Sequence, residues 1–326
     1  MNNPDHDPRL KPTPDYGPLG PGTDEQGEKR SKSRAGKLLP IVAMMVGVFC
    51  ALLVVTGGTA EAAWRELSEF LSITGKPKPA SPAILSEHET ENLDRASPQA
   101  QATLLLERAI NHYEGATDQI AARVDSWQGK IKLDSSLNGL FTTALNSNDL
   151  RVRAAAIEVD LAALGVTKNS ASVDQLATQA ESDDQKTKVW ALWTLGLLGN
   201  RGVEPGRVAE ILRAHIHDSN ENVRYWAVEG LAYLGTDEVI APLLQTFHDD
   251  PSPTVRERAA CGLAQSGMLN EQQRRSAIPQ LLDFAEDSSL DAQTHSWVYQ
   301  ALRDITGQNL PSDPAAWRNW YSNNAS

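Results

Sequence analysis

Cysteine is scarce in this chain. The 326 residues include only Cys50, which lies in a long apolar run, and Cys261, which lies in a segment with helical periodicity. Two isolated thiols do not provide the framework of a disulfide-stapled domain. The fold must therefore depend on a hydrophobic core, and an apolar fraction of 40% is sufficient for one or two domains.

Basic charge and strand-like patterning are also lacking. Residues 1–60 carry a formal net charge of +1 and the remainder carries −13, which together give the chain its net charge of −12. A body this acidic repels a phosphate backbone, so nucleic acid is not expected as a partner. From about residue 83 onward no alternation of apolar and polar residues appears, and the sequence predicts short helices throughout.

The short motifs of common catalytic sites are missing as well. The chain has no Gly-rich phosphate loop, no G-x-S-x-G and no H-E-x-x-H. His215 and His217 would face different sides of a helix, which favours a structural role over metal binding. His248 is interpreted as part of a turn and helix cap, and Cys261 has no evident base to activate it. We therefore predict a protein without catalytic residues, metal or cofactor.

One long hydrophobic run dominates the N-terminal part. Residues 38–58 contain no charge, and at about 1.5 Å per residue they match a hydrocarbon core of about 30 Å. We predict a transmembrane helix over 37–59 and a disordered cytoplasmic tail over 1–36. Lys and Arg cluster between residues 29 and 37, which places the N-terminus in the cytoplasm and the body outside it. The prediction is a single-pass inner-membrane protein with a periplasmic domain.

A cleaved signal is the alternative to this anchor. Ala60, Glu61 and Ala62 fit the small-x-small pattern of a cleavage site, and the chain would then be secreted after cleavage near Ala62. Residues 60–96 are predicted to form a juxtamembrane helix followed by a stiff, proline-rich linker. Trp64 would lie at the headgroup level of the membrane.

The strongest pattern in the body is a repeat. Glycines that follow Ala/Leu-rich segments recur at spacings of 34, 36, 32 and 40 residues, at Gly165, Gly199, Gly235, Gly267 and Gly307. A second helical segment and an acidic turn follow most of them. Such a glycine suits the left-handed residue that ends a helix. Because no unit can bury its apolar face alone, the units are predicted to stack.

Particular residue pairs connect this repeat to a known family. Val-Arg occurs at 152–153, 223–224 and 255–256, and Pro-Leu-Leu occurs at 242–244. The pattern resembles HEAT repeats, particularly the short type also seen in phycobilisome-lyase proteins. The resemblance implies an all-α fold, an α-solenoid of about five HEAT-like helical hairpins preceded by one transmembrane helix. It implies little about function, and bilin attachment is disfavoured because many non-enzymatic proteins share the repeat.

The solenoid is predicted to span residues 97–307. Residues 97–133 would form N-terminal cap helices and residues 134–307 the repeats, while residues 308–326 would form a C-terminal cap. Trp317, Trp320 and Tyr321 are expected to cover the last open apolar face. The column of Arg153, Lys188, Arg224 and Arg256 is expected to pair with turn aspartates of adjacent repeats, and turn aspartates are also expected to cap the first helices.

Aligning the repeats separates the aromatic residues into two groups. Trp190, Trp226 and Trp297 fall in one column, which is interpreted as packing, with Arg258 laid on Trp226. Trp193, Tyr225 and Tyr233 fall on less apolar columns and are expected to point outward. Outward aromatics are enriched at interfaces, so these three are predicted partner contacts.

Polar residues of the second helices form a further predicted contact set, which contains Glu210, Arg213, Gln245 and Asp283. The resulting hypothesis is a membrane-tethered scaffold that binds a protein or peptide on its acidic solenoid, without catalysis. The alternatives are a hydrolase or lyase with an unrecognised site in the groove, and a subunit of an envelope assembly or secretion complex.

Overall fold

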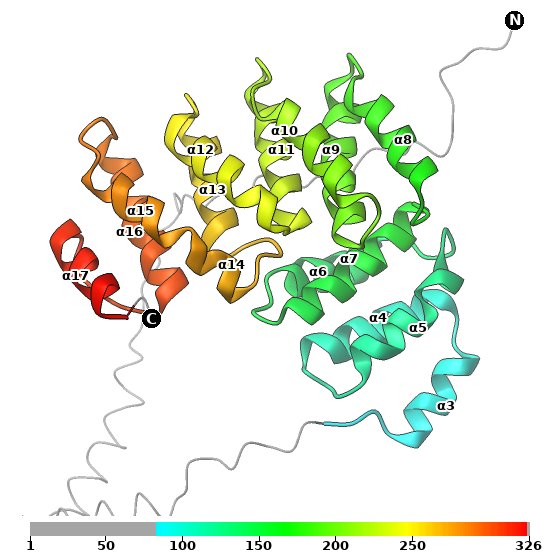
Figure 1. Ribbon diagram of the computed structural model, residues 1–326. Coiled ribbons are helices and arrows are strands. Elements are labelled where there is room, and N and C mark those ends of the chain that lie inside the picture. Colours follow the sequence, from blue (N-terminus) through cyan, green and yellow to red (C-terminus); the bar gives the residue numbers. More distant parts are fainter. Residues whose placement is uncertain (1–82, 325–326) are drawn as a thin grey trace, which may run out of the picture. The chain divides into compact units, whose positions relative to one another are not determined.

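The computed structural model describes residues 83–324, and within that range the chain contains helices and no named strand (Figure 1). The all-α prediction is confirmed for this part. No helix in it is both long enough and apolar enough to cross a membrane. The predicted cytoplasmic tail, the transmembrane helix and the linker up to residue 82 lie outside the described residues.

The repeats form two layers of helices. The first helices are α7 (Leu150–Leu164), α9 (Gln185–Asn200), α11 (Glu221–Leu234), α13 (Pro253–Ala264) and α16 (Ala292–Thr306). The second helices are α8 (Ser170–Ala180), α10 (Pro205–His215), α12 (Ile240–Asp249) and α15 (Ile278–Glu286). From α9 onward each first helix packs on the next first helix, and second helices cover one side of that layer (Figure 1).

Shorter helices flank and interrupt these layers. They are α3 (Glu87–Arg95), α4 (Pro98–Ile110), α5 (Ala116–Trp127), α6 (Ser135–Leu145), the 3-10 helix η1 (Asp237–Val239), α14 (Glu271–Ser276) and α17 (Pro314–Asn324). α17 packs on α15, and its Trp317 is fully buried. The short α14 is inserted between α13 and α15, so that unit has an extra turn between its two main helices.

The helix starts show how the acidic turns work. Asp149 caps α7 by accepting from the Arg151 amide, as predicted. In three later units the turn aspartate lies further upstream and accepts from an amide that precedes the helix, as Asp250 does from Ser252. The cap itself is then Asn220, Ser252 or Asp291. Prediction of these aspartates as caps was wrong in those units, because each one forms the turn that precedes the cap.

The glycine pattern is confirmed at three of its five positions. Gly165, Gly235 and Gly307 end their helices with φ near 70°. Gly267 is also left-handed, at φ 81°, but α13 ends before it at Ala264. Gly199 differs because α9 continues through it to Asn200, and the left-handed residue is Gly202 at φ 85°. A Cβ on Gly199 would lie 2.6 Å from Leu234 Cδ1, so this glycine serves close packing.

Close approach is most pronounced where α9 crosses α11. A Cβ on Gly196 would lie 2.6 Å from the Gly230 Cα, and a Cβ on Gly230 would lie 2.7 Å from the Leu192 carbonyl oxygen. Side chains longer than hydrogen cannot fit between the two backbones at this crossing. Gly196 and Gly230 therefore permit a backbone-to-backbone contact between α9 and α11.

The first predicted hairpin departs from the regular stack. α7 packs mainly with α4, α5 and α6, whereas α8 packs on α9. α7 also reaches the later repeats: the Arg153 guanidinium donates to the Gly267 carbonyl, and Glu158 pairs with Arg201 at 2.8 Å. The helix therefore lies against the first-helix layer and covers part of the side that the second helices leave open.

Candidate protein-interaction site

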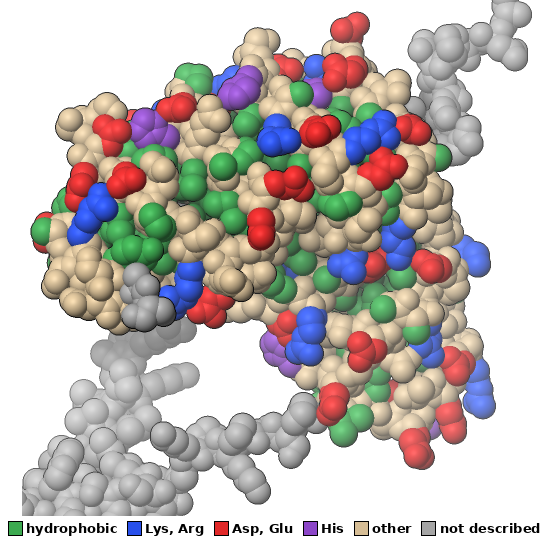
Figure 2. Space-filling view, viewed as in Figure 1, with side chains coloured by type: hydrophobic (Ala, Val, Ile, Leu, Met, Phe, Trp, Pro, Cys, Tyr) green, Lys and Arg blue, Asp and Glu red, His purple; other side chains and the backbone are tan. Residues whose placement is uncertain are grey.

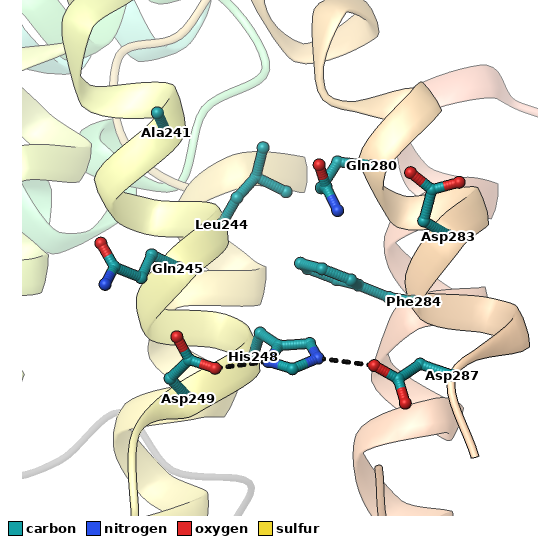
Figure 3. A pocket seen from close by; sticks show the side chains of 9 residues that line it. All are labelled: Ala241, Leu244, Gln245, His248, Asp249, Gln280, Asp283, Phe284 and Asp287. Atoms are coloured by element: carbon teal, nitrogen blue, oxygen red, sulfur yellow. Dashed lines mark hydrogen bonds and ion pairs between the residues drawn. The ribbon is translucent and has the colours of Figure 1, made fainter. Parts of the chain in front are cut away.

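A groove lies between α12 and α15, on the second-helix side of the repeats. It has a volume of about 490 Å³. Figure 3 shows its lining residues, which are Ala241, Leu244, Gln245, His248, Asp249, Gln280, Asp283, Phe284 and Asp287. Two predicted contact residues, Gln245 and Asp283, thus lie on opposite walls of one groove.

Helical periodicity explains which side chains reach the groove. On α12, Leu243 and Phe247 are buried toward the first helices, which leaves Leu244, Gln245 and His248 on the outer face. On α15, Leu281 and Ala285 are buried in the same way. Phe284 packs edge-on against Phe247 at a centroid distance of 6.0 Å, and its ring forms part of the apolar floor.

His248 connects the two walls. Its Nε2 lies 2.9 Å from Asp287 Oδ2, and its Nδ1 contacts the Asp249 carboxylate (Figure 3). Burial lowers the pKa of His248, but the hydrogen bonds to Asp249 and Asp287 outweigh burial and raise it overall. A neutral imidazole has one N–H, so only the protonated ring donates to both carboxylates. Protonated His248 thus donates both to Asp249 of its own helix and to Asp287 at the end of α15.

The acidic side chains of the groove differ in their partners. Hydrogen bonds from Ser289 and His248 hold the pKa of Asp287 well below its usual value. Asp283 accepts from Arg318 of α17 at 2.8 Å, and the same guanidinium bonds Glu286. Figure 2 shows acidic, basic and hydrophobic side chains interspersed over this view of the molecule. The groove therefore combines an apolar floor with carboxylates along both walls.

Glu210 and Arg213 lie elsewhere. Both are exposed on α10, as their sequence pattern predicted, but neither lines the groove between α12 and α15. The structure thus divides the four predicted second-helix residues into a pair that faces the groove and a pair on a neighbouring helix.

Two of the three predicted outward aromatics are buried. Trp193 and Tyr233 are each 5% exposed, and their rings meet edge-on at 4.8 Å. Trp193 is also a hydrogen-bond partner of Asp160 on α7. The predicted outward orientation of these two residues was wrong, because α7 covers their column. Tyr225 is half-buried, and a partner-contact role for any of the three stays a prediction.

The three tryptophans of the predicted packing column are more accessible to solvent than Trp193 and Tyr233. Trp190, Trp226 and Trp297 are all half-buried. Arg258, expected to stack on Trp226, instead pairs with Glu229 of α11 and donates to Ser266 at 2.6 Å. Burial raises the pKa of Glu229, and Arg258 opposes that shift. This ion pair lies between α11 and α13.

The predicted ladder of cations is confirmed for three members. Lys188 reaches Asp218 at 3.5 Å, Arg256 reaches Asp291 at 2.7 Å, and Arg224 forms two bonds to Asp250 at 2.8 and 3.1 Å. Each carboxylate belongs to the turn of the next unit. Arg153 is the exception: within residues 83–324 its guanidinium bonds the carbonyls of Ser147 and Gly267 and no carboxylate.

Sequence reasoning missed His248, Phe284 and Asp287 as groove residues. His248 and Asp287 were interpreted as turn residues because each lies near the end of a second helix. His248 follows Leu244 by four residues, Phe284 follows Gln280 by four, and Asp287 follows Phe284 by three, which was a usable signal within each helix. The approach of α12 and α15 that brings the two sets together could not be read from either helix alone. His215, by contrast, is buried and bonds the carbonyls of Ile211 and Ala180. Residues 83–324 contain no group of three or more His, Cys, Asp or Glu residues able to hold a metal ion.

Part of the chain is similar to a known repeat family. Residues 173–264 match the family model for HEAT repeats, from α8 to the end of α13. Two solved crystal structures of engineered proteins from the Northeast Structural Genomics Consortium are similar at 18% and 17% identity. They cover 67% and 64% of this chain and 96% and 99% of their own, each with a TM-score of 0.33. No curated protein matches the chain.

Proposed function

We propose that this chain is a membrane-tethered protein-interaction scaffold, in which the groove between α12 and α15 binds a segment of a partner protein. The HEAT-repeat match supports this proposal, because such repeats generally present extended surfaces to other proteins. The observation that carries it is the groove itself, which Gln245 of α12 and Asp283 of α15 both line, with Leu244 and Phe284 between the two helices (Figure 3).

The chemistry of the groove indicates the kind of partner. Leu244 and Phe284 offer an apolar seat, while Asp249 and Asp287 place negative charge beside it. The body of the chain carries −13, which adds a favourable field for a basic ligand. The expected partner segment therefore carries Lys or Arg beside one apolar side chain.

A non-catalytic role fits the groove better than the hydrolase or lyase alternative. The lining includes no Ser, Thr, Cys or Lys that would serve as a nucleophile. Both ring nitrogens of His248 are engaged by carboxylates, which leaves no free nitrogen for proton transfer to a substrate. The third hypothesis, a subunit of an envelope assembly or secretion complex, differs in that the tail over residues 1–36 would also dock, so deletion of that tail should abolish complex formation.

Tethering is the second part of the proposal and rests on the uncharged run at residues 38–58. The proposed arrangement is a single pass through the inner membrane, with the N-terminus cytoplasmic and the solenoid periplasmic. Reporter fusions after residues 36 and 96, combined with carbonate extraction, test it. A soluble protein that begins near Ala62 would instead support the cleaved, secreted form.

Site-specific photo-crosslinking tests the binding groove in the intact, anchored protein. A photoreactive residue at Gln245 or Gln280, which are both exposed in the groove, is expected to capture the same partner segment. The matched control is Gln293, which is exposed on α16 outside the groove. Capture of a Lys- or Arg-containing segment from the two groove positions alone supports the proposal. Identical products from all three positions, or none, would contradict it.

A further inference from the structure

A second pocket lies where the N-terminal helices meet the later repeats. It has a volume of about 380 Å³ and lies between the turn before α7, the end of α13, α14 and α16. In Figure 1, α14 lies beside the α6–α7 region, and the bond from Arg153 to the Gly267 carbonyl joins the two parts. The lining residues are Asn146, Asn148, Arg153, Ala264, Gln265, Ser266, Arg274 and Asp304.

Arg153 forms the floor of this pocket and is the unusual member of the cation ladder. The other ladder cations each have an aspartate partner in the next unit. Arg153 is 6% exposed, and no ion pair to a carboxylate is present for it among residues 83–324. The reason is the position of α7, which lies against the first-helix layer instead of stacking in register with α9. Its charge is therefore buried against carbonyl dipoles alone.

Arg274 brings a second cation to the same pocket. Its Nη1 donates to the Ala264 carbonyl at 2.9 Å, and its Nε is buried without a hydrogen-bond acceptor in the described part of the chain. Burial lowers the pKa of Arg153, and its neighbours Arg274 and Arg258 lower it further. A buried positive charge without a counter-ion is costly, so an anion at this point would relieve both guanidinium groups.

The remaining lining groups add mostly hydrogen-bond donors. Asn146, Asn148 and Gln265 place amide groups at the exposed mouth, and Ser266 adds a hydroxyl. Asp304 is the one carboxylate, and it accepts from Gln300 at 2.8 Å. Two arginines against one aspartate leave the pocket net positive, on a chain whose formal net charge is −12.

We propose that this pocket binds a phosphate group, as inorganic phosphate or as a small phosphate monoester. Arginine forks and amide donors recognise oxyanions through several charge-assisted hydrogen bonds. The donors come from separate elements, namely α7, α14, the turn before α7 and the loop after α13. Such a convergent set fits a tetrahedral group, whose oxygens point in several directions, better than a planar carboxylate.

Calorimetric titration of the full-length chain in detergent tests this site. Sodium phosphate, glycerol phosphate and sodium acetate are compared at constant ionic strength in chloride. Phosphate is expected to bind saturably at one site and to raise the melting temperature, while acetate does neither. A stronger response to glycerol phosphate than to inorganic phosphate identifies the monoester as the occupant, and the reverse identifies the free ion.

Matched variants make the result specific. Arg274→Gln is expected to weaken phosphate binding by about tenfold or more, which corresponds to the loss of a charge-assisted bond. Arg274→Lys keeps the charge and is expected to bind with intermediate affinity. Arg275→Gln removes the exposed neighbour, which pairs with Glu271, and is expected to bind as the parent does.

Two controls separate lost binding from lost folding. The melting temperature of Arg274→Gln in chloride reports its fold, and Asn148→Ala at the exposed mouth provides a second, milder loss of a donor. Non-saturating heats with phosphate would overturn the proposal, as would equal losses in Arg274→Gln and Arg275→Gln. Because this pocket is separate from the groove between α12 and α15, photo-crosslinking at Gln245 is independent of the outcome.

Discussion

Asp160 provides a sharp test of how α7 packs on the repeats. Its side chain lies on α7 with 0% exposure and faces Trp193 of α9. Burial raises the pKa of Asp160 from 3.8 to about 7, and the hydrogen bond with Trp193 opposes that shift. The folded chain therefore holds a proton at this site over a range in which the unfolded chain has released it. Stability from this group must decrease as pH rises between about 4 and about 7.

The magnitude follows from the pKa difference. One pKa unit corresponds to about 1.4 kcal/mol, so the full penalty at high pH is about 4 kcal/mol. Between pH 5 and pH 8 the unfolding free energy of the parent should fall by about 3 kcal/mol through this carboxyl alone. Asp160→Asn keeps the shape and removes the ionisation, so the variant should gain about 3 kcal/mol relative to the parent over the same interval.

Denaturant unfolding followed by tryptophan fluorescence at several pH values measures this difference. Comparing variant with parent cancels the contributions of the other carboxylates, and Asp183→Asn, which removes an exposed carboxylate in the turn before α9, serves as the control. A constant difference between Asp160→Asn and the parent from pH 5 to pH 8 would refute the placement of this side chain in a dry interface beneath α7.

Three further perturbations address the stack and the groove. Gly230→Ala should destabilise the fold by roughly 3 kcal/mol or more, because its Cβ would meet the Leu192 carbonyl oxygen. Gly206→Ala, at an open position, is the control. Equal melting temperatures for the two variants would disprove the tight crossing of α9 and α11. Arg224→Met should lower the free energy of unfolding by about 3 kcal/mol, because it leaves the buried Asp250 without its ion-pair partner. Denaturant unfolding measures this loss, and a loss below about 1 kcal/mol would contradict the prediction. His248→Gln should cost at most about 1 kcal/mol at a partly exposed site. Because folding raises the pKa of His248, its contribution to stability is fully present below about pH 6.5 and is lost as pH rises through the folded pKa. The cost of His248→Gln should therefore decrease as pH rises, and a cost that grows with pH would contradict this assignment.

Much of the repeat was accessible from the sequence because its rules are local. A glycine in the left-handed region ends α11 at Gly235, as the repeat of glycines predicted. Val223, Ala227, Leu231 and Leu234 recur at helical spacing along α11, and all four are buried. The cation of one unit meets the turn aspartate of the next at a fixed spacing, as Arg224 meets Asp250. These features depend on neighbours within one or two units, which periodicity can specify.

The aromatic columns could not be assigned in the same way. Periodicity distinguishes the more apolar face of a helix, but it does not reveal a third layer on the opposite face. Trp193 and Tyr233 are buried because α7 covers them, whereas Trp226, in the column next to the alanines, is more accessible. The composition of α7 carried the missing signal: Val152, Ile157, Val159 and Leu161 are apolar on several sides, which is typical of a helix placed between two neighbours.

The groove depends on where α15 lies along α12, and the short inserted helix α14 precedes α15 in the chain. Gln245 and Asp283 were selected as polar residues on second helices, and only the position of α15 after α14 brings them to one site. His248 and Asp287 meet for the same reason. An inserted turn of a few residues shifts a helix along its neighbour, and the sequence does not specify by how much.

The most direct measurement of the scaffold proposal is the affinity of the captured partner segment for the full-length chain and two lysine variants. Gln245→Lys adds a positive charge beside the groove carboxylates, and Gln293→Lys adds the same charge on exposed α16. A basic partner bound in the groove predicts about tenfold weaker binding for Gln245→Lys and unchanged binding for Gln293→Lys. Equal affinities for both variants would contradict binding between α12 and α15.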